Sequence, residues 1–193
     1  MKRVCVFCGS GVGARDEYAE AARAMAAAMK KRNIGLVYGG GHVGLMGVIA
    51  DAVLAGGGEV IGVIPHGLAV REVGHQGVTE LRVVHSMHER KALMADLSDG
   101  FIALPGGFGT FEEFCEIITW AQLGIHRKPC GLLNVAGYYD PLLALFDRAV
   151  ADRFIRPEYR ALVLEESDPD RLLDLLVNYQ SPVSEKWISR GET

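Results

Sequence analysis

The sequence predicts an α/β fold in which a doubly wound, mostly parallel sheet carries helices on both faces. Short apolar segments alternate along the chain with longer segments that have the composition of helices. The short segments are apolar throughout rather than at every second position, which is typical of strands buried on both faces of a parallel sheet. Clusters of glycine follow three of these segments, at positions where a strand would turn into a helix.

The predicted strands are apolar runs that end at a residue which breaks a strand. The first ends at Gly9, the second at Gly39, the third at Pro65 and the fifth at Pro105. A polar loop separates the third strand from the fourth. The strands are expected over residues 4–8, 36–38, 60–64, 81–84, 101–104, 130–135 and 162–164.

The predicted helices lie between these strands. The first, over residues 16–31, is rich in alanine and methionine, with acidic residues at its start and basic residues at its end, which suits the helix dipole. The others are expected over residues 45–54, 87–94, 110–123, 141–152 and 169–177. With right-handed crossovers, this order gives a Rossmann-like fold whose ligands bind beyond the carboxyl ends of the strands.

Length and composition limit the class of protein. The chain has 193 residues, so we expect one domain over residues 1–180, followed by a mobile tail over residues 181–193. The net charge of −4 argues against a general nucleic-acid-binding protein. No apolar stretch is long enough to span a membrane, and the N-terminus does not resemble a signal peptide. Four cysteines are too few for a disulfide framework, so we expect a reducing, cytoplasmic setting.

Three glycine-rich loops, which begin at Gly9, Gly39 and Gly106, are predicted at the same edge of the sheet. Glycine lets the backbone come close to a ligand, and the free N–H groups at the start of a helix attract anions. One such loop is ordinary turn chemistry, whereas three together favour a ligand that carries phosphate. Ser10 in the first loop and Gly41 in the second are therefore candidate binding residues.

Other binding and catalytic motifs fit less well. Gly9-x-Gly11-x-x-Ala14 matches the dinucleotide fingerprint, but the second strand ends in Tyr38 and glycines, without the acidic residue that would hold the ribose of NAD. No glycine loop is followed by Lys-Ser or Lys-Thr, as a P-loop requires. The histidine and cysteine spacings indicate neither a metal site nor a redox pair, and no Gly-x-Ser-x-Gly sequence indicates a hydrolase triad. We expect no metal and no cofactor.

The third loop reads Pro105-Gly106-Gly107-Phe108-Gly109-Thr110-Phe111-Glu112-Glu113. Its glycines keep side chains away from the start of the following helix, and the Thr110 hydroxyl can donate to a phosphate oxygen. Two interpretations of Glu113 are open. In the first, Thr110 and Glu113 form a capping box and the carboxylate only caps the helix. In the second, the carboxylate faces a ligand.

Helical spacing predicts which side of this helix carries Glu113. One apolar stripe, which we expect to face the sheet, consists of Phe111, Phe114, Cys115 and Ile118. Glu113 then points the opposite way, on an outer face that is itself partly apolar. An outer face of that kind needs a cover, so we predict a homodimer through the helix after Gly109, with Glu113 in a cleft near the interface.

The helix after the fourth strand carries the other candidate group. Met87, Arg90, Lys91 and Met94 fall on one face at helical spacing. This face is either solvated, or it lines a pocket in which methionine contacts a flat base and Arg90 binds a carboxylate or phosphate. An arginine and a carboxylate such as Glu113 permit, without requiring, cleavage of an N-glycosidic bond, because its transition state resembles an oxocarbenium ion.

These motifs also carry a resemblance to a known family. Residues 105–113 resemble the PGGxGTxxE signature of the LONELY GUY (LOG) family of cytokinin-activating phosphoribohydrolases, and Met87-His88-Glu89-Arg90-Lys91 is similar to the second motif of that family. The similarity covers roughly residues 4–180, a typical single domain. It implies hydrolysis of AMP, or of its N6-prenylated form, to a free base and ribose 5-phosphate. Such proteins were formerly labelled lysine decarboxylases, but no lysine here lies in a recognisable pyridoxal-phosphate site.

The resemblance implies roles for individual residues and a dimeric state. Arg90 and Glu113 would be the catalytic pair, and Glu72 would contact the sugar or the base. The candidates for substrate or phosphate binding are Gly106, Gly107, Gly109, Thr110, Lys91, Met87, Glu72, Thr119, Ser10 and Gly41. The alternative is a carrier or sensor with the same fold that binds a nucleotide or the molybdenum cofactor without hydrolysing it. A carrier would not need the two charged residues, which favours the enzyme.

Overall fold

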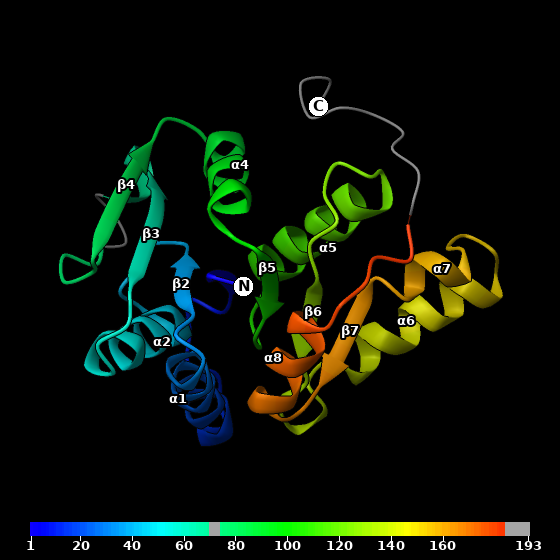
Figure 1. Cartoon of the computed structure of the whole chain (residues 1–193), viewed down its shortest axis with the longest axis horizontal. Coiled ribbons are helices and arrows are strands. Elements are labelled where there is room, and N and C mark those ends of the chain that lie inside the picture. Colours follow the sequence, from blue (N-terminus) through cyan, green and yellow to red (C-terminus); the bar gives the residue numbers. More distant parts are fainter. Residues whose placement is uncertain (70–73, 184–193) are drawn as a thin grey trace.

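The computed structural model describes residues 1–69 and 74–183, and its architecture is the predicted one (Figure 1). Its sheet has seven strands, and every pair of neighbours is parallel. The strands are β1 (Arg3–Phe7), β2 (Gly35–Tyr38), β3 (Val60–Pro65), β4 (Glu80–Val84), β5 (Gly100–Ala103), β6 (Cys130–Leu133) and β7 (Val163–Glu166). Their order across the sheet is β4-β3-β2-β1-β5-β6-β7, so the doubly wound α/β fold is confirmed.

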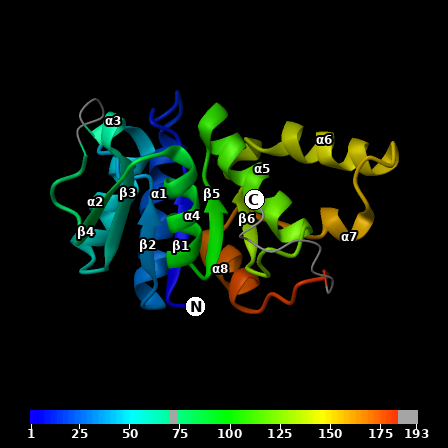
Figure 2. The same ribbon diagram turned by 90° about the horizontal axis from the view of Figure 1, so that it is seen from above.

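Helices cover both faces of this sheet. Their bounds are α1 (Asp16–Lys31), α2 (Gly44–Ala55), α3 (His66–Ala69), α4 (Met87–Leu97), α5 (Phe108–Gln122), α6 (Asp140–Ala151), α7 (Pro157–Arg160) and α8 (Pro169–Val177). One apolar core joins the sheet to α1, α2 and α8, and a second core joins its other face to α4, α5 and α6 (Figures 1 and 2). Strands buried on both sides in this way account for the uniformly apolar runs of the sequence.

Every predicted strand is present with bounds within two residues of those expected, and every predicted helix is present. The short helices α3 and α7 and the 3-10 turn Val135–Gly137 were not predicted, because a single turn is too short to show helical periodicity. Of the expected tail, residues 184–193 lie outside the described part, and Val183 packs against Ala121 and Leu162. Among the helices described, none has both the length and the apolar character needed to cross a membrane.

The strand order determines where a ligand can bind. β1 lies between β2 and β5, so the chain winds in one direction from β1 to β4 and in the other from β5 to β7. The register pairs Val6 with Tyr38 and Phe7 with Ala103, which brings the loops after β1, β2 and β5 to the same edge. This is the switch point at which ligands bind in open parallel sheets, and the three glycine loops meet there.

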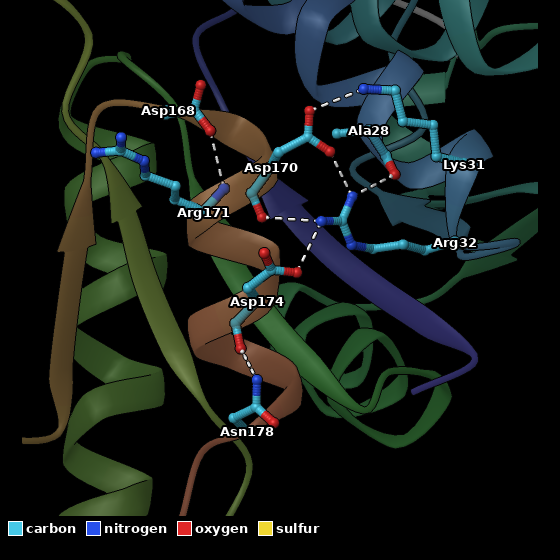
Figure 3. A network of polar contacts seen from close by, with 8 residues as sticks. All are labelled: Ala28, Lys31, Arg32, Asp168, Asp170, Arg171, Asp174 and Asn178. Atoms are coloured by element: carbon cyan, nitrogen blue, oxygen red, sulfur yellow. Dashed lines mark hydrogen bonds and ion pairs between the residues drawn. The ribbon is translucent and has the colours of Figure 1, made fainter.

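A network of charged side chains joins two helices on one face of the sheet (Figure 3). The guanidinium of Arg32, just after α1, donates to Asp170 at 2.5 Å and to Asp174 at 2.7 Å, and both acidic residues belong to α8. Lys31 adds a 2.9 Å contact with Asp170. Arg32 also donates to the carbonyl of Ala28, so its planar head is held on several sides.

Candidate functional site

A cavity of about 280 Å³ opens at the switch point, between the first and third glycine loops. It is lined by Gly9, Ser10, Gly11, Val12, Gly13, Tyr18, Leu45, Pro105, Gly106, Gly107 and Tyr138. The N–H of Gly9 donates to the carbonyl of Pro105 at 3.0 Å, which fixes the two loops against each other. A Cβ on Gly106 would lie 2.2 Å from the Thr110 hydroxyl oxygen, so only glycine fits there. The structure thus brings together Ser10, Gly106, Gly107 and Thr110, as predicted.

A larger depression of about 690 Å³ lies at the opposite edge, near Arg3 and Gly35 at the amino ends of β1 and β2. Its glycine run is already satisfied, because the amides of Gly57 and Gly58 donate to the carbonyls of Leu54 and Val53. Arg3 is paired with Glu59. Lys2 and Lys30 also line this depression. The carboxyl edge is preferred as the candidate site because ligands of open parallel sheets bind beyond the carboxyl ends of the strands.

Arg90 of α4 and Glu113 of α5 form a buried ion pair. Nη1 of Arg90 lies 3.5 Å from Oε1 of Glu113, and each side chain is 11% exposed. The guanidinium is held from behind, because its Nε donates to the carbonyl of Val63 at 3.1 Å. The second glycine loop also packs on it, since a Cβ on Gly39 would lie 2.1 Å from Nη2 of Arg90. Met87, half-exposed at the start of α4, places its sulfur 3.7 Å from Nη1.

Burial changes the ionisation of Glu113. It raises the pKa of this carboxyl above the usual value, and the attraction of Arg90 offsets part of the rise. Perturbed carboxyl groups of this kind are common at catalytic sites. Glu113 lies one turn beyond Thr110 on the same buried stripe of α5, about 5 Å further along the helix. A ligand whose anionic group rests on the Gly106 loop can therefore reach Glu113 with its next atoms.

The predicted orientation of α5 is confirmed only in part. Phe114 is buried, and Phe111 and Ile118 pack against the core as expected, but the buried face is rotated toward Glu113. The residues buried against the sheet are Thr110, Glu113, Phe114, Ile117 and Ala121, whereas Cys115 is exposed. Both stripes have helical spacing, and the sequence favoured the more apolar one. The observed stripe contains two polar residues: Thr110 lies beside Gly106, and Glu113 is paired with Arg90. Glu113 consequently points inward, toward Arg90, rather than to the outer face.

The capping-box interpretation of Glu113 is also wrong. Helix α5 begins at Phe108, and Gly107 occupies the N-cap without a side-chain hydrogen bond, so Glu113 lies inside the helix. A cap of this type occurs instead on α4. There the Ser86 hydroxyl accepts the N–H of Glu89 at 3.1 Å, and the Glu89 carboxylate accepts the N–H of His85 at 2.8 Å. The carboxylate of Glu113 is therefore not used as a helix cap.

Other predicted site residues are placed differently. Lys91 is bound between Glu112 and Glu116 of α5, with Nζ at 2.7 Å and 2.9 Å from their Oε1 atoms. Thr119 is exposed, donates to the carbonyl of Cys115, and lies about 13 Å along α5 from Thr110.

The remaining candidates are two glycines and one glutamate. Gly109 is in the first turn of α5 and Gly41 in the loop after β2. Glu72 lies outside the described residues.

Two groups of residues near these loops were not predicted. Tyr18 and Tyr138 line the cavity, and no motif marks them. His42, Asp51 and His75 place possible ligand atoms within 4.8 Å of one another.

The geometry of the histidine cluster suits an anchor better than a metal site. His75 contacts Asp51 through Nε2 at 2.9 Å, and its Nδ1 accepts the N–H of Gly77, so both ring nitrogens are used. A metal-bound histidine instead donates from its second nitrogen. The backbone N–H of His75 donates to the carbonyl of Gly40 at 3.0 Å, which ties this segment to the second glycine loop.

Comparison with known proteins gives one consistent result. Residues 46–176 match the family model described as possible lysine decarboxylase. Two rice (Oryza sativa subsp. japonica) relatives are named probable cytokinin riboside 5′-monophosphate phosphoribohydrolases. LOGL9 is 57% identical over 93% of this chain and 79% of its own length, and LOGL2 is 53% identical over 98% and 78%. The cytokinin riboside 5′-monophosphate phosphoribohydrolase LOG1 of Arabidopsis thaliana is 52% identical over 98% and 89%.

Solved structures with the same fold are more distant. The molybdenum cofactor carrier protein of Chlamydomonas reinhardtii superposes with a TM-score of 0.70 at 19% identity, covering 92% of this chain and 99% of that one. The molybdenum cofactor binding protein of Rippkaea orientalis has a TM-score of 0.68 at 21% identity, covering 92% and 96%. At this level of identity the similarity establishes the fold alone.

Proposed function

This chain belongs to the LOG family of cytokinin riboside 5′-monophosphate phosphoribohydrolases, and we propose that it hydrolyses the N-glycosidic bond of adenosine 5′-monophosphate or its N6-prenylated form. The products are the free base and ribose 5-phosphate. The buried ion pair of Arg90 and Glu113 carries this proposal, because it places one ionisable carboxylate and one fixed cation beside the glycine loops.

The phosphate end of the substrate would rest on the third glycine loop. The first four N–H groups of a helix lack intrahelical partners, and the glycines at the start of α5 leave them accessible. Thr110, next to Gly106, can add its hydroxyl. From there the ribose would extend toward Glu113, one helical turn further on.

Glu113 would act at the anomeric carbon. As the bond to the base breaks, positive charge develops on the sugar, and a nearby carboxylate stabilises it. The same carboxylate can take a proton from the attacking water, whose hydroxyl adds to C1′ as the bond to the base breaks. The departing base takes up one proton from solvent, and Glu113 returns its proton to solvent, so one water is consumed in all. Arg90, fixed by Val63, opposes the effect of burial on the pKa of Glu113 and so favours the ionised carboxylate.

The purified protein should release free base from these substrates. AMP and isopentenyladenosine monophosphate are incubated with it separately, and the base is followed by chromatography. Faster release from the prenylated substrate indicates a cytokinin-type base, and release from AMP alone indicates nucleotide salvage. Binding without release from either would contradict the enzyme and favour the carrier or sensor.

We further propose that the chain forms a homodimer through the outer face of α5. Phe108 at its start is 92% exposed, and half-buried Trp120 lies further along. Oε2 of Glu116 is buried without a hydrogen-bond partner among the described residues, which a donor from a second copy would correct. Exposed apolar side chains of this kind are typical of a subunit interface. Thr119, remote from the cavity of its own chain, would then lie at the interface.

Sedimentation tests the dimer. We expect a dimer at micromolar concentration, and Phe108→Asp should shift the protein toward monomer. Val177→Asp is the matched control, because Val177 is exposed on α8, on the opposite face of the sheet. A wild-type monomer, or dissociation by both substitutions, would contradict this interface.

A further inference from the structure

Three successive carbonyl groups of the third glycine loop are each held by a hydrogen bond. The carbonyl of Leu104 accepts the hydroxyl of Tyr139 at 2.6 Å, that of Pro105 accepts the N–H of Gly9 at 3.0 Å, and that of Gly106 accepts the hydroxyl of Tyr138. In a trans peptide the C=O and the following N–H point in opposite directions. Each held carbonyl therefore also fixes the direction of the next N–H.

These peptide groups differ in what they can offer a ligand. The peptide after Leu104 has no N–H, because the next residue is Pro105. The peptide between Gly106 and Gly107 does have one. Gly107 lines the cavity, and its N–H has no acceptor among the described residues.

The phosphate end of the cavity depends on such amides. Among the described residues that line it, none is a lysine or an arginine. The nearby cation Lys91 is already bound by Glu112 and Glu116. Of the described groups, the backbone N–H groups and the helix start are those that can bind an anion in this cavity, and the strength of that binding depends on the direction of each N–H.

The ring of Tyr138 is itself firmly placed. It meets Tyr18 edge-on at 5.7 Å and Tyr139 at 5.1 Å between ring centroids, and it stacks on Phe111 at 6.5 Å. The preceding turn carries Ala136 and Gly137 with positive φ, which brings the ring under the loop. Its hydroxyl therefore reaches the Gly106 carbonyl from a rigid support.

We propose that Tyr138 is a positioning residue for phosphate: by holding the Gly106 carbonyl, it aims the N–H of Gly107 at the 5′-phosphate of the substrate. This role rests on the proposed function, since the phosphate is that of the nucleotide. Tyr138 does not itself contact the reacting atoms. Loss of its hydroxyl should weaken the binding of every ligand that carries the phosphate. The binding of the base and the rate of the chemical step should not change.

Tyr138→Phe tests the role, because it removes only the hydroxyl. We expect KM for AMP and the inhibition constant of ribose 5-phosphate to rise about tenfold, which is about 1.4 kcal/mol and comparable to the net contribution of one hydrogen bond. The value of kcat should stay within about twofold of wild type. The inhibition constant of adenine, which has no phosphate, should not change.

Tyr139→Phe is the matched control. It removes a hydroxyl bond to the same loop, but that bond orients a peptide without an N–H. We expect a lower Tm and an unchanged inhibition constant for ribose 5-phosphate. An unchanged constant in Tyr138→Phe, or an equal rise in both variants, would overturn the positioning role.

Two further measurements keep the proposal testable. Calorimetry measures the binding of ribose 5-phosphate to each variant without turnover. A wild-type protein that binds ribose 5-phosphate but does not hydrolyse AMP would therefore contradict the proposed function and not the positioning role. If Tyr138→Phe does not fold, amide NMR of the wild type replaces it. The Gly107 amide should then shift strongly on addition of ribose 5-phosphate, and the lack of a shift would overturn the role.

Discussion

Arg90 and Glu113 face each other from two adjacent helices, with Nη1 and Oε1 3.5 Å apart and both side chains almost wholly buried. This separation exceeds the 2.7–2.9 Å of a close charge-assisted hydrogen bond. The guanidinium therefore stabilises the negative charge of Glu113 without occupying its lone pairs at close range. A carboxylate in this state can still accept a proton from water.

Glu113→Gln should abolish most of the turnover and preserve nucleotide binding. Glutamine keeps the shape of the side chain but cannot stabilise positive charge or accept a proton from water, so kcat should fall by about 10²–10³-fold. Chromatography of the released base measures turnover, and calorimetry measures binding. Glu89→Gln is the control, because it removes a neighbouring charge while glutamine still caps α4. Wild-type turnover in Glu113→Gln would mean that this carboxylate is structural.

The pH dependence of kcat/KM should reflect the raised pKa of Glu113. The reaction needs the ionised carboxylate, so activity should fall as the pH drops through that pKa. Because burial raises it, the acidic limb should lie above about 4.3, the value of an ordinary glutamate. A profile from about pH 4 to 8 measures the limb. A limb at or below the ordinary value would contradict the assignment of Glu113.

The same pKa shift predicts a gain in stability when the charge is removed. Between the unfolded and the raised folded pKa of Glu113, the folded protein binds more protons, so the free energy of unfolding decreases as the pH rises through that interval. Glu113→Gln should therefore raise Tm at neutral pH, and the gain should vanish below the ordinary glutamate pKa. Calorimetric scans at both pH values check this. An equal change in Tm at the two pH values would show that ionisation is not its cause.

Gly39→Ala should reduce activity without unfolding the protein. The added methyl group would lie 2.1 Å from Nη2 of Arg90, and the far end of this flexible side chain can move aside. A displacement of about 1 Å at a catalytic group can cost about 10²-fold in rate. Gly67→Ala is the control, because a Cβ there meets nothing within 4 Å. Normal turnover in Gly39→Ala would show that the position of Arg90 is not critical.

Arg32→Met should lower Tm and leave turnover unchanged. It removes the guanidinium that joins Asp170 and Asp174 while keeping much of the apolar stem (Figure 3). Because these partners are partly exposed, the decrease in Tm should be smaller at high salt. The Tm of Arg32→Lys should lie between that of the wild type and that of Arg32→Met, since lysine lacks the planar fork of the guanidinium. Thermal scans at low and high salt measure the effect, and a salt-independent loss would indicate packing instead.

The fold could be predicted because glycine and proline mark the strand ends. Gly39 and Pro65 end uniformly apolar runs, and the structure ends β2 and β3 at or beside these positions. The motif on the third loop likewise drew attention to Glu113. The buried face of α5 could be predicted only in part. Hydrophobicity favours the stripe with Cys115 over one that contains Thr110 and Glu113. Buried polar residues at a site defeat the pattern that predicts the core.

Contacts between residues that are far apart in the chain could not be predicted from the sequence. The hydroxyl of Tyr138 meets the Gly106 carbonyl across 32 residues, and Arg32 meets Asp170 across 138. No periodicity connects such positions, since each contact depends on how strands and helices pack. The ion pair of Arg90 with Glu113 is of the same kind, although both residues were predicted separately from their motifs.

The separation of Arg32 from Asp170 has a consequence during synthesis. When α1 leaves the ribosome, most of the 138 residues that follow Arg32 up to its partner have not yet been made. β1 also keeps one open edge until β5 appears, although β2 can already pair with it. The sheet is therefore completed from its centre outward, and the Arg32 network closes only when α8 emerges. Until then the nascent chain exposes the apolar surface that Leu172 and Leu176 later cover, which is where a ribosome-associated chaperone would act.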